Sequence, residues 1–154
     1  MHPVGFDQNQ LCSLAALLDD VIPPSADGRM PGAGRLGLAE RVSKDVCAQP
    51  AVAEVIRAGL EMLDRTAHDE FGRPFAELEP ADRRRIVADL AEAGTPLAAM
   101  LGFPTYMAYY EHPKVLVALG REARPPHPEG YVLEPFDERL LDAVRKRGRF
   151  YREI

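Results

Sequence analysis

Apolar residues recur at intervals of three and four along most of this chain, which is the spacing of one face of an α-helix. The first such series runs from Leu11 to Ile22, and a longer one runs from Val52 to Phe71. Proline and glycine separate the series, and proline ends a helix because it lacks a backbone donor. The one short β-like run is at residues 131–133. We therefore predict an all-α fold, a single helical domain of about six or seven helices.

Two long Pro/Gly-rich segments are predicted to be loops, at residues 21–34 and 124–131. Neither can be helical over its length, because proline removes a donor and glycine permits positive φ. Loops of this length without secondary structure are often functional. We expect both to be semi-rigid surface features, suited to holding a partner.

Capping residues and prolines place the helix boundaries. Asp7 and Gln10 have the spacing of a capping box, so the first helix is expected to begin at Asp7. Pro50 and Pro80 suit the first turns of two further helices. The remaining helices are expected over residues 36–48, 97–110, 114–119 and 137–148.

Two of these helices carry further expectations. Residues 97–110 are apolar on most sides, which predicts a central helix buried by its neighbours, with a kink or break at Pro104 near Phe103. The last helix is expected to bury Leu140, Leu141 and Val144. The domain is predicted to span residues 1–154, with the C-terminal helix and a basic tail at 136–154.

Charged clusters are interpreted as solvated. Asp19 and Asp20 are neighbours in sequence and do not share a helix face, so a solvated helix end is favoured over a catalytic pair. Arginines occupy positions 83–85, but nearby carboxylates balance them. A salt-bridged, solvated face is therefore favoured over a phosphate site.

The composition argues against a nucleic-acid binder. The formal charge is −5 and the pI is near 5.4, whereas phosphate neutralisation needs a basic surface. Cys12 and Cys47 can form one disulfide, but free thiols buried on helix faces are favoured. We expect no membrane span. The N-terminus shows no leader, so we expect a cytoplasmic protein, or a periplasmic one if a twin-arginine leader was removed or a partner carries the complex out.

No catalytic, cofactor-binding or metal-ligating residue is predicted. The four histidines have no metal-ligand spacing, and the serines have no obvious base beside them. A histidine at position 112, after Glu111, is expected to bond to backbone at a helix end. Tyr106, Tyr109 and Tyr110 form a cluster that is interpreted as part of the core, with hydroxyl groups that reach the surface. The alternative is a stand-alone helical enzyme whose cleft lies near Tyr106, Tyr109, Tyr110 and His112.

Several segments, taken in order, resemble the gluconate 2-dehydrogenase subunit 3 family over residues 10–131. The resemblance starts with the helix at 14–23 and the later Pro31-Gly32-Ala33. It continues in residues 75–78, with Pro80, Arg83 and Arg84 after them. It ends in Phe103, Thr105, Tyr109-Tyr110, His112-Pro113, Val115, Leu119-Gly120 and the loop at 126–131.

The resemblance implies an accessory small subunit, or chaperone, of a large FAD-dependent dehydrogenase of the glucose–methanol–choline type. That partner would oxidise sugars, sugar acids or polyols and carry the flavin and the catalytic residues, with a cytochrome c subunit as a further partner in some complexes. Candidate partner-binding residues are Pro23, Pro24, Pro31, Gly32, Tyr109, Tyr110, His112, Pro126 and Tyr131. A helical interaction module unrelated to redox chemistry, binding through the Pro-rich loops, is the remaining alternative.

Overall fold

The computed structural model describes residues 5–123 and 135–147. The chain divides into two units, Met1–Arg124 and Pro125–Ile154, and each is described by itself. All regular structure in the described residues is helical, which confirms the all-α prediction. That residues 1–154 form one domain stays a prediction.

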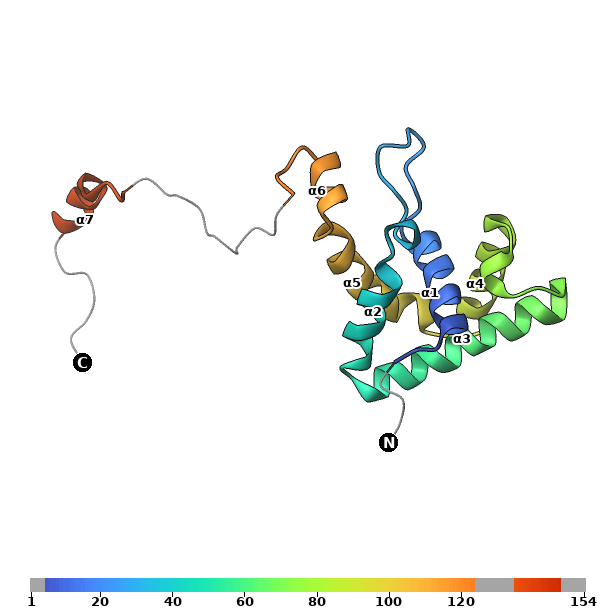
Figure 1. Ribbon diagram of the computed structural model, residues 1–154. Helices are drawn as coiled ribbons and strands as arrows, with labels where there is room; N and C mark the ends of the chain where they lie inside the picture. Colours follow the sequence, from blue (N-terminus) through green and yellow to red (C-terminus); the bar gives the residue numbers. More distant parts are fainter. Residues whose placement is uncertain (1–4, 124–134, 148–154) are drawn as a thin grey trace, which may run out of the picture. The chain divides into compact units, whose positions relative to one another are not determined.

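The first unit is a bundle of helices around α1. Its helices are α1 (Gln8–Val21), α2 (Leu38–Cys47), α3 (Pro50–Phe71), α4 (Pro80–Glu92), α5 (Leu97–Tyr110) and α6 (Pro113–Ala118). Two 3-10 helices, η1 (Gly34–Leu36) and η2 (Phe75–Glu77), lie between them. Contacts join α1 to α2, α3, α4 and α5, and Figure 1 shows α1 in the middle of this group.

Local signals start the helices where they were expected. The Asp7 carboxylate accepts a hydrogen bond from the Gln10 backbone N–H at 2.8 Å, and the Gln10 side chain accepts from the Asp7 N–H at 3.1 Å. This capping box satisfies two donors that the first turn of α1 leaves without helical partners. Pro50 and Pro80 are the first residues of α3 and α4, where a missing N–H costs nothing.

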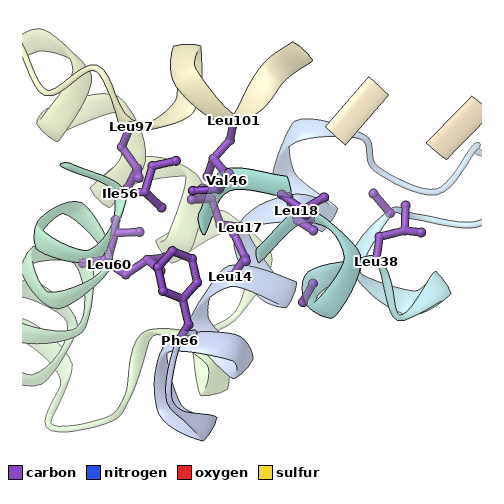
Figure 2. Close-up of a cluster of buried hydrophobic side chains, with 14 of the residues drawn as sticks. Phe6, Leu14, Leu17, Leu18, Leu38, Val46, Ile56, Leu60, Leu97 and Leu101 are labelled. Atoms are coloured by element: carbon purple, nitrogen blue, oxygen red, sulfur yellow. The ribbon is translucent and has the colours of Figure 1, made fainter. Parts of the chain in front are cut away.

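The core forms where α1, α3 and α5 meet. Leu14, Leu17 and Leu18 of α1 are fully buried. Figure 2 shows Ile56 of α3 beside Leu97 of α5. A Cβ on Gly59 would lie 2.9 Å from a Leu97 methyl carbon, so glycine lets α5 approach α3 closely. Full burial of one such leucine contributes about 1.5–3 kcal/mol.

Helix α5 differs from its prediction. It runs unbroken through Pro104, and a second hydrogen bond supports that turn, from the Thr105 hydroxyl to the Leu101 carbonyl oxygen at 2.5 Å. Only one face is buried, the face with Leu101 and Thr105, while Phe103 is 76% exposed. The expected burial on most sides is wrong, because the contacts of α5 with α1, α2, α3 and α4 leave the side chains on one of its faces uncovered.

The second unit contains only short helices in its described part. These are η3 (Glu138–Leu141) and α7 (Asp142–Arg145), and the Asp137 carboxylate accepts from the Arg139 N–H at 3.0 Å at their start. The predicted continuous helix burying Leu140, Leu141 and Val144 is wrong, because these side chains are 69%, 36% and 59% exposed. The described residues of this unit supply no second apolar element to cover them.

Candidate partner-binding site

The loop between α1 and η1 is closed by its own hydrogen bonds. At its base the Ala33 N–H donates to the Ile22 carbonyl oxygen at 3.0 Å. Further out, the Ser25 N–H donates to the Met30 carbonyl oxygen, and the Met30 N–H donates to the Ser25 hydroxyl, both at 2.9 Å. Figure 1 shows the loop projecting beyond the end of α1. Its backbone is therefore held in one shape before any partner arrives.

Asp27 organises the tip of this loop. Its carboxylate accepts from the Ser25 hydroxyl at 2.5 Å, and from the Arg29 backbone N–H at 3.1 Å. The Arg29 guanidinium lies 2.5 Å from the same carboxylate. These bonds lower the pKa of Asp27, and the hydrogen bond from Ser25 contributes most. The carboxylate therefore stays ionised at neutral pH.

Asp19 holds the inner end of the loop against α1. Its carboxylate accepts from the Gly34 N–H at 2.8 Å and from the Arg35 N–H at 3.2 Å, at the start of η1. A Cβ on Gly32 would lie 2.3 Å from this carboxylate, and one on Gly34 would lie 2.0 Å from the Ala15 carbonyl oxygen. Gly32 and Gly34 thus allow the loop to approach α1 closely. The prediction that Asp19 is solvated is wrong. Its carboxylate accepts hydrogen bonds from backbone N–H groups at the start of η1, which have no acceptor within that helix.

Asp20 is also in the interior, paired with Arg83 of α4. The Arg83 Nε lies 3.0 Å from an Asp20 carboxylate oxygen, and the two side chains are 11% and 6% exposed. Arg83 also donates to the Leu78 carbonyl oxygen at 2.8 Å. The solvated interpretation is wrong for both residues, since α1 and α4 pack together here. It is correct for Arg85, which pairs at the surface with Glu70 and Asp89.

Tyr109 joins the loop to α5. Its ring is buried and its hydroxyl donates to the Pro31 carbonyl oxygen at 2.8 Å. Burial raises the pKa of Tyr109, which keeps the hydroxyl protonated and able to donate. Tyr109 and Gly32 were predicted to contact a partner, but both lie in the interior and hold the loop in place.

The opposite side of α5 presents an exposed apolar surface. Phe103, Tyr106, Met107 and Tyr110, here called the α5 stripe, are 76%, 48%, 47% and 49% exposed. Their spacing of three, four and seven residues puts them on one helix face. The rings of Tyr106 and Tyr110 stack with centroids 6.2 Å apart and planes 7° apart. Within residues 5–123, the stripe is therefore a partly ordered aromatic surface without a partner.

The other predicted contact residues lie in different surroundings. Pro23 and Pro24 are exposed on the loop, and Pro31 is half-buried. His112 is half-buried, and its Nδ1 accepts from the Lys114 N–H at 3.2 Å to cap α6, as its interpretation as a helix-end residue predicted. The remaining two, Pro126 and Tyr131, lie outside the described residues, as does the second Pro-rich loop. The partner-binding role of the whole set stays a prediction.

Phe103 and Met107 were missed as contact candidates. Their signal is present in the sequence as the spacing shared with Tyr106 and Tyr110. That spacing occurs in a segment apolar on nearly every side, so the sequence did not show which face packing leaves open.

Two cavities bear on the enzymatic alternative. Tyr106 lines one of about 430 Å³, between α4 and α5, but Tyr109, Tyr110 and His112 are not among its lining residues. The second cavity, of about 470 Å³, includes Ser13 and Asp64. The Ser13 hydroxyl donates to both Asp64 carboxylate oxygens at 2.9 and 2.8 Å, and the Phe75 N–H donates to the same group at 3.0 Å. Asp64 thus ties α1, α3 and η2 together.

No three histidine, cysteine, aspartate or glutamate side chains gather as a metal site within residues 5–123 and 135–147. Cys12 and Cys47 are free thiols, but Cys12 is exposed, so its predicted burial is wrong. In the described part of the chain no single helix is long and apolar enough to cross a membrane; α4 and α5 reach that length only as a pair bent by 119°.

Comparison with known proteins identifies the family. A 75-residue stretch is 31% identical to the RNA replication polyprotein of Apple stem pitting virus, covering 42% of this chain and 3% of the viral protein. The chain thus spans about 3% of the length of that curated relative. No solved structure matches the chain. The family described as gluconate 2-dehydrogenase subunit 3 matches residues 8–120, which include the closed loop, Tyr109 and the α5 stripe. The chain therefore belongs to the gluconate 2-dehydrogenase subunit 3 family.

Proposed function

We propose that this protein is a noncatalytic accessory subunit of a flavin-dependent dehydrogenase acting on a sugar, a sugar acid or a polyol. The flavin and the reacting groups belong to the large subunit, and this chain helps that subunit to fold and stay soluble. Family membership supports the general role of a dehydrogenase subunit. The observation that carries the proposal is the α5 stripe.

The α5 stripe has the composition of an interface core. Aromatic residues and methionine are enriched where proteins bind one another, and a few such side chains supply most of the binding energy. Covering one of them fully contributes about 1.5–3 kcal/mol, so four neighbours on one helix face can supply a large share of an affinity. Within residues 5–123 no neighbouring element covers these side chains.

The closed loop adds a second, rigid contact surface. Its exposed prolines, Pro23 and Pro24, sit on a backbone that is already ordered by internal hydrogen bonds. A pre-ordered loop loses little conformational entropy on binding. Tyr109 connects the loop to α5, so the loop and the α5 stripe are positioned by the same helix.

Co-expression tests the proposal. A candidate large flavoprotein subunit from the same organism is produced with and without this chain, and its soluble yield, flavin content and co-purification are measured. We expect the large subunit to be soluble and flavin-loaded only when this chain is present, and to elute with it. A large subunit that is soluble and active alone, and that does not bind this chain, would refute the proposal.

Paired variants locate the contact. Phe103→Ser with Tyr110→Ser removes two side chains of the α5 stripe and should abolish co-purification. Val55 and Met62, which are 41% and 43% exposed on α3, provide a matched control when both are changed to serine. Circular dichroism melting of each purified variant shows whether the fold is retained. Equal loss of binding in both pairs would contradict the assignment of the α5 stripe.

A further inference from the structure

A groove between α4 and α5 adjoins the α5 stripe. It corresponds to the cavity of about 430 Å³, and small side chains of the two helices form much of its wall, including Ala88, Ala91, Ala98 and Gly102. A Cβ added at Gly102 would meet no heavy atom within 4 Å, so the space above this glycine is open. Tyr106 lines the groove and is also part of the α5 stripe, so the two surfaces are continuous.

Arg84 is a cation at this groove without an ion-pair partner within residues 5–123. The two arginines beside it in sequence are both ion-paired: Arg83 pairs with Asp20, and Arg85 pairs with Glu70 and Asp89. Arg84 lines the groove and is exposed, and no carboxylate within residues 5–123 pairs with it. Asp20 also lines the groove, but its charge is taken up by Arg83. Helix α5 carries no charged residue, so the groove has an apolar wall and a cation on its α4 side.

We propose that this groove receives a segment of the large subunit that carries a bulky apolar side chain next to an aspartate or glutamate. This inference rests on the proposed function and names the chemistry of the contact. The apolar side chain fills the space above Gly102, and the carboxylate pairs with Arg84. Charge complementarity favours an acidic segment, because a basic one would leave two cations together in a partly desolvated site.

Four single variants test the two halves of the contact. Arg84→Glu reverses the charge, and Gly102→Leu fills the groove from within. Arg73 is an exposed arginine elsewhere, so Arg73→Glu is the matched charge control. Ala58 is exposed on α3, so Ala58→Leu is the matched control for added bulk on a helix. The relative dissociation constant of each variant is measured at low and high salt by its competition with the tagged wild-type chain for the large subunit in the purified, co-expressed complex.

We expect Arg84→Glu and Gly102→Leu each to weaken binding by about tenfold or more, as at interface anchors, and both controls to stay near wild type. Wild-type binding should weaken as salt rises, whereas Arg84→Glu should lose or reverse that dependence, because salt screens the repulsion between the new carboxylate and the partner's carboxylate. Normal binding by both groove variants, with wild-type binding intact, would overturn this inference and leave the proposed function standing. No binding by the wild type would overturn both. Dimerisation of the isolated chain that Gly102→Leu abolishes would show a second copy as the occupant and also overturn it.

Discussion

The Asp20–Arg83 pair gives a sharp test of how this fold is held together. The two side chains are 6% and 11% exposed, and the Arg83 Nε lies 3.0 Å from an Asp20 carboxylate oxygen. Removing one partner of a buried pair leaves an uncompensated charge and costs about 3–5 kcal/mol. Arg83 keeps its bond to the Leu78 carbonyl oxygen and some contact with water, so we expect the lower end, about 3 kcal/mol, for Asp20→Ala.

A double-mutant cycle separates the pair from its surroundings. Arg83→Met keeps an apolar stem but leaves the Asp20 carboxylate buried, and should cost about 3 kcal/mol as well. The double variant buries no unpaired charge and loses the Arg83 bond to the Leu78 carbonyl oxygen, so its cost should fall to about 1 kcal/mol. The effects of the two single changes therefore should not add, and their coupling free energy should be about 5 kcal/mol.

Urea unfolding followed by circular dichroism measures these free energies, because the chain has no tryptophan to report by fluorescence. The control cycle uses Arg41 and Asp45, a surface pair at 2.9 Å whose side chains are 54% and 42% exposed. Solvent screening should limit its coupling to about 0.5 kcal/mol. Additivity at Asp20 and Arg83 within about 0.5 kcal/mol would refute the reasoning and support a solvated helix end.

Three further predictions concern the loop and the thiols. Gly34→Ala should destabilise the protein by about 2 kcal/mol or more, because its Cβ would lie 2.0 Å from a backbone oxygen of α1, whereas Gly102→Ala should not; a Gly34→Ala melting temperature equal to wild type would contradict the close approach. Tyr109→Phe should cost about 1 kcal/mol in urea unfolding by removing a 2.8 Å hydrogen bond. Burial raises the pKa of Tyr109, so the stability that its protonated hydroxyl contributes is present below the unfolded pKa of about 10 and is lost at higher pH. The free energy of unfolding should therefore fall less above that pH in Tyr109→Phe than in wild type. Thiol titration without reductant should find both cysteines reduced, with Cys12 reacting faster than the half-buried Cys47; a single disulfide would contradict this.

The candidate site was only partly predictable from sequence. The closed loop was expected, because proline and glycine exclude a helix there whatever the rest of the chain does. The groups that bond to its inner end were not expected from the sequence. Asp19 accepts from a backbone N–H 15 residues away, and Tyr109 donates to a carbonyl oxygen 78 residues away. The α5 stripe was hidden for a related reason. A helix apolar on all sides shows no preferred face until its neighbours cover one.

What the sequence determined by itself is local: the helical class, the start of α1 at its capping box, and the starts of α3 and α4 at proline. Each of these depends on hydrogen bonds and backbone angles within a few residues. The tertiary structure alone decided the rest, namely that Asp19 and Asp20 turn inward, that Tyr109 supports the loop, and that one face of α5 stays in water. These outcomes depend on which groups meet after packing, and Asp20 meets Arg83 across 63 residues of chain.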